Sequence, residues 1–427
     1  MGKRTALILI YCFMLATAVQ AQDSTATQQA PAPGGNCREM DLIDWIRKWF
    51  KITKPQKEKN SAFFIAPVFG STPSNGFIFG ATFQSAFRMK NSNLSAFQTN
   101  IQYTSKNQLL IFMRNTIYAK ENKLLLSGDW RYFAYSEPTF GLGTNAPEGT
   151  LPWYFNYTGS GEVTDSLTQP MKYNYLKLHQ LLSWRVAPGF YVGAGIHFDM
   201  FSDIKDEKLK LDTPGVFITS HYGYSKAYQF NPDKYKEIGI SANFVYDTRD
   251  NQINAYKGMY ANLNYRYNPE FLGSDQNSSS LYTEFRYFKG LSKKNERVVL
   301  GFWYIGNFTV SGNQPYLALP ALGYDQRSKT GRGYAIGRFR GNSFMYVESE
   351  LRFPISRCTK TLGGVVFANL TTTDSKPAGV KLGQYVQPGF GAGVRILFSK
   401  KTRMNIQLDY GKGERSSGVY FGASEVF

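Results

Sequence analysis

The sequence predicts an all-β membrane protein, a 16-stranded antiparallel transmembrane β-barrel preceded by a short N-terminal amphipathic helix. Three observations predict this fold class. The chain begins with an export signal, and the residues from 61 onward alternate between apolar and polar side chains. The connections between the alternating segments are tight turns and long loops by turns along the chain. After residue 30 the 427-residue chain offers no run of ~18 apolar residues for a membrane-spanning helix.

Residues 1–21 have the three-part layout of a signal peptide. Lys3 and Arg4 are basic, residues 6–18 are apolar, and Ala21 ends a small-residue cleavage site. The alternative interpretation is a buried N-terminal helix. The formal net charge of +18 would otherwise suggest nucleic acid as a partner. An exported chain rarely meets nucleic acid, so we predict no nucleic-acid partner.

Residues 22–60 are predicted to be a periplasmic linker and an amphipathic helix. Gln, Ala, Thr, Pro and Gly dominate residues 22–36, as in flexible linkers. Residues 39–50 then repeat apolar side chains, among them Trp45 and Trp49, at roughly helical spacing beside lysines and arginines. This pattern suits a helix that lies in a lipid interface. A helix packed inside or beneath the main domain is an equally open interpretation.

Residues 61–427 are predicted to form the barrel, because their apolar side chains recur with a period of two. In the segment 259–268 one face carries Met259, Ala261, Leu263, Tyr265 and Tyr267, and the other carries Tyr260, Asn262, Asn264, Arg266 and Asn268. A soluble sandwich alternates too. Repetition along the whole chain at ~10 residues per strand, together with the export signal, favours a barrel that is apolar toward lipid and polar toward its lumen.

The alternation divides this region into an even number of strands, so both barrel ends are expected on the periplasmic side. The predicted strands are 62–70, 75–90, 94–104, 109–119, 123–135, 171–186, 189–201, 237–248, 258–268, 279–291, 297–310, 342–355, 361–371, 387–399, 403–412 and 418–427. Tight connections fit periplasmic turns, whereas the long connections 136–170, 202–236 and 311–341 fit outer loops.

Much of the positive charge lies in the tight turns. Those near residues 90, 120–123, 293–297, 357–360 and 400–403 hold 11 Lys and Arg against 2 acidic residues, a net charge of +9. Charge at one rim of a barrel favours contact with anionic headgroups, so outer-membrane lipids are the first predicted partner. A docking face for an acidic protein partner is the alternative.

No enzyme chemistry is predicted. The three histidines, His179, His197 and His221, lie near no Ser nucleophile motif, and no HExxH, GxSxG or P-loop pattern occurs. We therefore predict no catalytic residue, metal site or cofactor. After signal removal two cysteines remain, Cys37 and Cys358, and both are expected in the oxidising periplasm. One hypothesis is a disulfide that pins the N-terminal helix beneath the barrel; the other is two unrelated thiols.

The C-terminal half carries a family resemblance. The segment Gly331-Arg-Gly-Tyr-Ala-Ile-Gly-Arg-Phe-Arg-Gly341, followed by Glu348-Ser-Glu-Leu-Arg-Phe-Pro354, resembles the barrels of BamA, TamA and the two-partner-secretion transporters, also called bacterial surface antigen barrels. Segments 246–251, 140–145 and 408–427 also look like the family. The resemblance spans roughly residues 61–427 and implies sixteen strands and the outer membrane of a Gram-negative bacterium.

The resemblance also implies that the sixth outer loop folds back into the lumen with an Arg-Gly-Tyr motif at its tip. Arg332, Gly333 and Tyr334 occupy that place in this chain. The strand after the loop puts Tyr346, Glu348, Glu350 and Arg352 on its polar face, which must point inward. We therefore expect Arg332 to pair with Glu348 or Glu350, with Asn369 as an added neutral acceptor.

Two departures from the family bear on function. Residues 22–60 are too short for the periplasmic POTRA domains of members that insert or export proteins, and Phe367-Ala-Asn369 replaces the family's Phe-x-Asp. Two hypotheses stay open. The first is a protein insertion or translocation factor, acting on unfolded outer-membrane protein clients or with a periplasmic or lipoprotein partner. The second is a passive pore or structural barrel subunit of an outer-membrane complex, without translocase activity.

The first hypothesis needs a barrel that opens laterally between its first and last strands. Strand one contains Pro67, which has no N–H to donate, and Gly70, and the last strand ends at Phe427. We therefore predict that the first and last strands pair poorly along this lateral seam.

Overall fold

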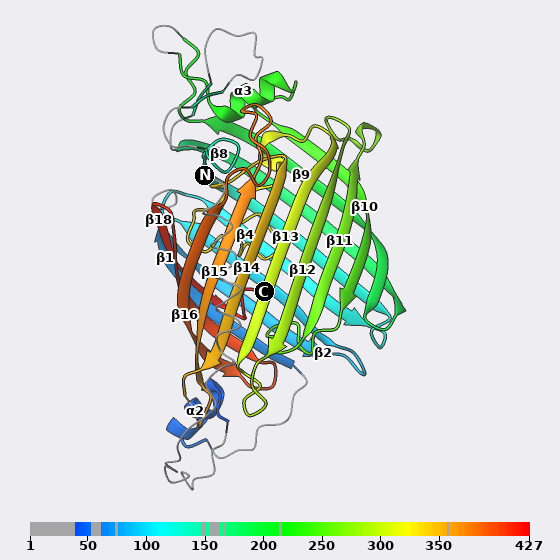
Figure 1. Ribbon diagram of the computed structural model, residues 1–427, viewed down its shortest axis with the longest axis vertical. Coiled ribbons are helices and arrows are strands. Elements are labelled where there is room, and N and C mark those ends of the chain that lie inside the picture. The colour runs from blue at the N-terminus through cyan, green and yellow to red at the C-terminus, as the bar shows by residue number, and fades with distance from the viewer. Residues whose placement is uncertain are drawn as a thin grey trace. The chain divides into compact units, whose positions relative to one another are not determined.

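The described part of the chain is dominated by one large antiparallel sheet. The computed structural model describes residues 39–427 except 53–60, 73–75, 147–150, 154–162, 166–167, 213–215 and 357, so the predicted signal peptide and most of the linker lie outside it. Sixteen strands form the sheet, and each pairs with its neighbours in chain order (Figure 1). Two short strands, β6 and β7, pair separately. The predicted all-β antiparallel fold class is confirmed.

The bounds of the elements follow the alternation of the sequence closely. The helices are α2 (Leu42–Trp49), α3 (Ser220–Ala227), η2 (Glu270–Leu272) and η3 (Tyr316–Ala318). The strands are β1 (Ser61–Thr72), β2 (Gly76–Arg88), β3 (Leu94–Thr104), β4 (Leu109–Ala119), β5 (Leu124–Thr139), β6 (Leu151–Trp153), β7 (Val163–Asp165), β8 (Gln169–Ala187), β9 (Phe190–Asp206), β10 (Tyr235–Asp247), β11 (Gly258–Asn268), β12 (Ser278–Gly290), β13 (Val299–Gly312), β14 (Ser343–Pro354), β15 (Leu362–Thr373), β16 (Gln387–Ser399), β17 (Met404–Gly413) and β18 (Ser416–Ala423).

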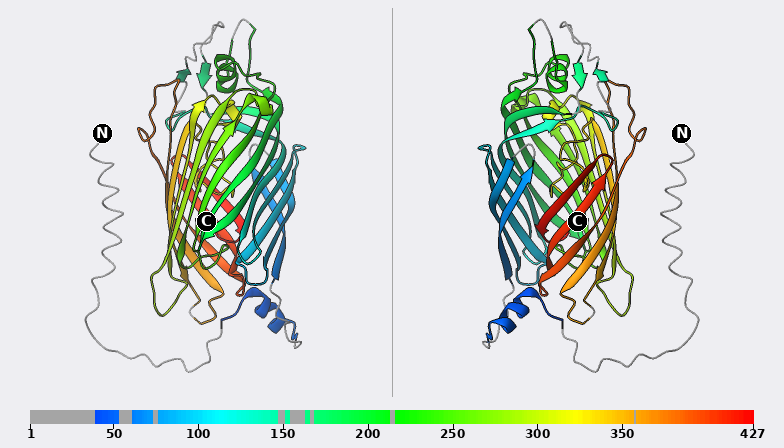
Figure 2. Two further views of the ribbon diagram at one scale, coloured as in Figure 1. Left: turned by 90° about the vertical axis from the view of Figure 1, so that its right-hand side faces the viewer. Right: turned by 90° about the vertical axis from the view of Figure 1, so that its left-hand side faces the viewer.

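The sheet exposes apolar side chains on its outer face and buries polar side chains on its inner face, which is the opposite of a soluble protein. In β11, Leu263 on the outer face is 41% exposed, whereas Arg266 on the inner face is 8% exposed. Strands far apart in the sheet order meet across the inner face, since the Tyr118 hydroxyl of β4 donates to the Asp247 carboxylate of β10 at 2.5 Å. The sheet therefore curls around a polar interior and exposes an apolar outer surface suited to lipid (Figure 2).

The edge strands β1 and β18 lie next to each other where the curled sheet meets itself (Figures 1 and 2). Among the residues that the structure describes, β1 pairs only with β2, and β18 pairs only with β17. We call the line between these two strands the seam. Because no backbone ladder crosses it within this part of the chain, a closed barrel remains a prediction.

Strands β5, β8 and β9 run farther into the predicted outer loops than the alternation indicated. The pair Thr139↔Gln169 continues the β5–β8 ladder beyond the predicted end at residue 135, and β9 extends to Asp206. The physical reason is that a ladder needs only backbone partners. Once the strands leave the lipid, their outer face no longer has to be apolar, and the sequence pattern fades before the pairing ends.

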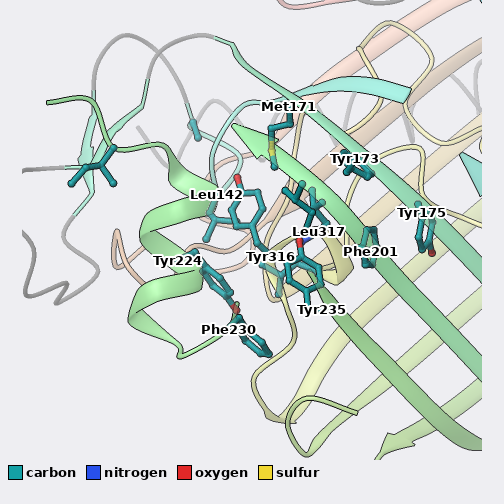
Figure 3. Packing of buried hydrophobic residues seen from close by; sticks show 14 residues of the cluster. Leu142, Met171, Tyr173, Tyr175, Phe201, Tyr224, Phe230, Tyr235, Tyr316 and Leu317 are labelled. Atoms are coloured by element: carbon teal, nitrogen blue, oxygen red, sulfur yellow. The ribbon is translucent and has the colours of Figure 1, made fainter. Parts of the chain in front are cut away.

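A buried cluster closes over the loop end of the sheet. Helix α3, whose N-cap is Thr219, packs Tyr224 against Tyr316 of the loop after β13, with ring centroids 5.6 Å apart (Figure 3). Tyr235 lies in the same cluster and accepts a hydrogen bond from the Leu317 backbone N–H at 3.0 Å. The outer loops therefore carry their own core, which fixes the point where the loop between β13 and β14 enters the interior.

Helix α2 lies at the opposite end of the strands from α3 (Figure 1). Asp41 and Asp44 form a capping box at its start, and Lys400 of the β16–β17 turn binds the Asp44 carboxylate at 2.6 Å. The Trp45 indole donates to the Thr361 hydroxyl at 3.0 Å, but Trp49 is 83% exposed. The helix is thus tied to the turns on one side while its other side presents aromatic rings, and contact with lipid remains a prediction.

The described helices are also too short or too polar to cross a bilayer.

Orientation can be tested with two exposed positions at opposite ends of the sheet. Asp275 lies in the β11–β12 loop, where the neighbouring Gln276 binds the Tyr228 carbonyl next to α3, and Lys294 lies in the β12–β13 turn. We expect Asp275→Cys to react with a membrane-impermeant maleimide on intact cells and Lys294→Cys to react only after the outer membrane is permeabilised. The opposite labelling pattern would mean that the loops and turns are assigned to the wrong sides.

Candidate functional site

The loop between β13 and β14, residues 313–342, folds into the interior of the sheet and carries the candidate site. Arg340, near the end of the loop, joins it to the beginning by donating to the carbonyls of Tyr316 at 3.1 Å and Leu317 at 3.0 Å. Asp325 holds the middle, because its carboxylate accepts from the backbone N–H of Lys329 at 3.0 Å and of Thr330 at 2.9 Å. The loop therefore enters the lumen as a structured unit.

At its tip, Arg332 is 2% exposed and sits among three carboxylates. Its Nη2 lies 2.5 Å from Glu348 Oε1 and 2.8 Å from Glu350 Oε2, and its Nη1 lies 2.8 Å from Asp409 Oδ2. The guanidinium also lies 3.5 Å from the centroid of the Phe367 ring. We call Arg332 and these three carboxylates the Arg332 cluster. It joins the loop to β14 and to β17 at once.

The negative charge of the Arg332 cluster is largely offset by two neighbouring arginines, Arg352 and Arg395. Arg395 shares Asp409 at 2.5 Å and also binds Glu425 at 2.7 Å, while Arg352 binds Glu350. Three guanidiniums thus face four carboxylates in one buried network. Burial alone would lower the pKa of Arg332, but the three carboxylates around it hold that pKa well above its usual range. Removing this cation would leave buried negative charge behind.

The backbone around Arg332 is held as closely as its side chain. Gly333 has φ +114°, and a Cβ there would lie 2.8 Å from the Lys412 carbonyl carbon, so only glycine fits. The Gly333 N–H donates to the Tyr420 hydroxyl at 2.8 Å, and the Tyr334 hydroxyl donates to the Pro388 carbonyl at 2.6 Å. The Arg-Gly-Tyr segment therefore binds strands β16 and β18 as well as β14 and β17.

Asn369 has a different role from the expected one. We expected an acceptor for the Arg332 side chain, but the Asn369 amide donates to the Arg332 backbone carbonyl at 3.0 Å. The third acceptor of the guanidinium is Asp409, which was not among the predicted site residues. The alternation of the sequence already places Asp409 on the inward-facing side of a predicted strand, because Asn405, Gln407 and Asp409 form its polar face.

Both predicted strand-one residues of the seam lie within β1. Pro67 pairs in register with Ala81 and Gly70 with Ile78, both on β2. The side chains that meet across the seam come from residues beside its two edge strands. Gln84 of β2 donates its amide to the hydroxyl of Ser424, which follows β18, and the rings of Phe64 of β1 and Phe398 of β16 meet edge to face at 4.8 Å. Side-chain contacts of this kind are fewer than the bonds of a strand ladder.

Phe427 does not lie at the seam, which corrects the predicted last strand of 418–427. Strand β18 ends at Ala423, and Ser424 has φ +77°, which turns the chain inward. Phe427 is then 2% exposed and stacks on Trp303 of β13 at 5.2 Å, while its carbonyl accepts from Arg352 at 3.0 Å. The aromatic residue gains more by burial in the lumen than by extending the edge of β18.

These features have counterparts among known proteins. A family model described as the Omp85 superfamily domain matches residues 188–427, which is more than half of the chain. The chain belongs to the Omp85 superfamily. The resemblance to BamA- and TamA-type barrels that the sequence suggested is thereby confirmed. Omp85 membership also places the protein in the outer membrane of a Gram-negative bacterium, as predicted.

Two solved structures of CdiB share the fold of this Omp85 chain at low sequence identity. CdiB from Escherichia coli is 9% identical with a TM-score of 0.51, over 87% of this chain and 63% of that one. CdiB from Acinetobacter baumannii is 11% identical with a TM-score of 0.50, over 86% and 60%. BamA from Haemophilus ducreyi lacking POTRA domains 1–3 is 14% identical with a TM-score of 0.49, over 86% and 71%. No curated protein matches the sequence.

The predicted disulfide is only partly visible in this Omp85 chain. Cys358 is disulfide-bonded, whereas Cys37 lies outside the described residues, so their pairing remains a prediction. The backbone three residues after Cys37 contacts the backbone next to Cys358, because the Met40 N–H donates to the Thr359 carbonyl at 2.9 Å, and this contact supports the pairing. As for metals, the described residues contain no group of three or more His, Cys, Asp and Glu side chains that could hold an ion.

Proposed function

We propose that this Omp85 chain is a protein insertion or translocation factor of the outer membrane whose barrel opens laterally at the seam. The observation that carries the proposal is the absence of a β1–β18 backbone ladder within the described residues. The hydrogen bond that crosses the seam there joins the side chains of Gln84 and Ser424. Separating β1 from β2 would break a ladder of 12 residue pairs, and each buried hydrogen bond left unmade is costly. Opening at the seam is therefore the least costly way to expose strand edges to a client.

In this proposal β1 is the strand that moves, and the loop with Arg332 stabilises the strands on the other side of the seam. Arg332 ties the loop to β14 and β17, while Gly333 binds β18 through Tyr420. Strand β18 is thus bound by the loop through Tyr420, and among the described residues it has a strand partner on one side only. We infer that the loop keeps the last strands in place while β1 separates from them.

The proposed partners follow from the surfaces. Outer-membrane lipids would contact the exposed apolar face of the strands, and the basic turns and Trp49 would meet headgroups. Unfolded outer-membrane proteins are the proposed clients, and a periplasmic or lipoprotein partner could bind on the α2 side. The proposal includes no catalytic residue, metal or cofactor.

The alternative function is a passive pore or a structural barrel subunit without translocase activity. A cavity of about 240 Å³ inside the sheet favours it, because a solute could occupy that space without any strand moving.

Depletion of the protein separates the two functions. If it inserts proteins, we expect many other outer-membrane barrel proteins to fall together in abundance when the outer membrane is quantified by mass spectrometry, before growth stops. Restoring the wild-type chain should restore them. An unchanged barrel proteome combined with altered uptake of small solutes would contradict insertion and support the pore.

A further inference from the structure

The interior cavity has a basic lining, and Arg332 is not among its lining residues. It lies between the loop of residues 313–342 and strands on the far side of the lumen, including β4, β8, β11 and β12. The basic side chains in its lining are Arg114, Lys177, Arg249, Arg266, Arg286 and Arg327, against the acidic Asp129 and Asp325. A cavity with this excess of positive charge attracts anions.

Four of the six basic side chains bind a carboxylate, although Lys177 shares its carboxylate with Arg131. Lys177 binds Asp129 at 2.7 Å, Arg249 binds Asp247 at 2.7 Å, Arg266 binds Asp199 at 2.7 Å, and Arg286 binds Glu284. These pairs account for Asp129 and use three further carboxylates of the wall. They leave Arg114 and Arg327 to be explained.

Neither Arg114 nor Arg327 forms an ion pair within the described part of the chain. Arg114 donates through Nη2 to the neutral Gln98 amide oxygen, while its Nη1 is buried without a hydrogen-bond partner. Asp325 is the remaining acid of the lining, but its oxygens already accept from three backbone N–H groups, including that of Arg327 at 2.8 Å. Asp325 therefore shapes the loop and attracts Arg114 electrostatically, but it forms an ion pair with neither guanidinium.

Arg327 is also repelled by the positively charged side chains around it. Burial and the nearby Arg286, Arg114 and Arg249 together hold the pKa of Arg327 well below its usual range. A guanidinium does not lose its proton in a protein, so this cost persists until an anion offsets it. Arg249 and Arg286 cannot turn away, because both stack on the Tyr260 ring, at 4.5 and 4.8 Å.

We propose that the cavity binds a free dianionic oxyanion of the phosphate class between Arg114 of β4 and Arg327 of the loop. Two guanidiniums that have no ion-pair partner among the described residues match a double negative charge. The planar fork of arginine fits the oxygens of phosphate in a bidentate manner. A soluble anion is the ligand rather than a lipid headgroup, because polar side chains line the cavity and acyl chains would have to follow the headgroup into it. The bound anion would join the loop to β4, independently of the Arg332 cluster.

Titration of the purified full-length chain in detergent with inorganic phosphate tests this site. Ionic strength is held constant with sodium chloride, and the readout is the temperature at which the barrel loses its heat-modifiable gel mobility. A ligand that binds only the folded state raises this temperature in a saturable way. We expect Arg114→Gln and Arg327→Gln each to move the half-saturating phosphate concentration at least tenfold higher. Arg415→Gln, in the exposed β17–β18 turn, should leave it unchanged.

Several outcomes would overturn the site. These are the lack of a saturable rise, an equal rise with chloride alone, a rise with succinate but not with phosphate, or a phosphate response that both variants retain. Should either variant fail to fold, ³¹P NMR of wild-type protein decides the matter. Line broadening of phosphate that excess sulfate reverses supports the site, and an unbroadened line overturns it.

Discussion

Replacing Arg332 with alanine is expected to destabilise the barrel more than any other single change considered for this protein. The substitution removes the cation that lies 2.5 to 2.8 Å from Glu348, Glu350 and Asp409, all of which are buried. Loss of one partner from a buried ion pair costs about 3–5 kcal/mol, because the remaining charges stay buried without compensation. We expect Arg332→Ala to lose heat-modifiable gel mobility at a clearly lower temperature and to expose residues 313–342 to protease.

Three companion variants separate charge from packing. Arg332→Lys should recover only part of the stability, since an ammonium cannot reproduce the planar bonds to three carboxylates. Adding Asp409→Asn to Arg332→Ala should also recover part of it, because one stranded charge is removed. Arg415→Ala, in an exposed turn, is the matched control and should behave as wild type. If Arg332→Ala keeps wild-type mobility, protease resistance and yield, the loop is not held by this cluster.

Linking the seam covalently is expected to abolish protein insertion. Gln84 of β2 and Ser424 touch across the seam, and both side chains line the interior cavity. The double variant Gln84→Cys/Ser424→Cys can therefore be joined by a short, permeable bismaleimide. If the barrel opens laterally between β1 and β18, linked cells should lose other outer-membrane barrels to the extent seen on depletion, while the unlinked variant should support normal levels.

The control for this experiment uses the same first residue. Gln84 is in register with Gln98 on β3, and Gln98 also lines the cavity, so Gln84→Cys/Gln98→Cys joins two strands that are already paired. Linking this pair should leave the barrel proteome intact. Equal effects of the two links would point to damage by the reagent, and normal insertion with the seam fully linked would exclude lateral opening.

Much of the architecture could be predicted because the bilayer imposes a local rule on each strand. Every second side chain must suit lipid, so the alternation of residues such as Leu263 and Asn264 reports which face is outside. The same rule turned Glu348 and Glu350 inward, and the family motif then indicated Arg332 as their partner. Both carboxylates lie next to the guanidinium in the structure.

The tertiary structure alone decided which inward-facing groups meet. Asp409 joins Arg332, Phe427 leaves the edge of β18 for Trp303, and Arg114 and Arg327 share a cavity, although long stretches of sequence separate these partners. Alternation fixes the face of a strand but not its neighbour across the lumen, because that neighbour depends on how the whole sheet curves. The same curvature sets how β1 and β18 meet, and no local pattern in either strand encodes it.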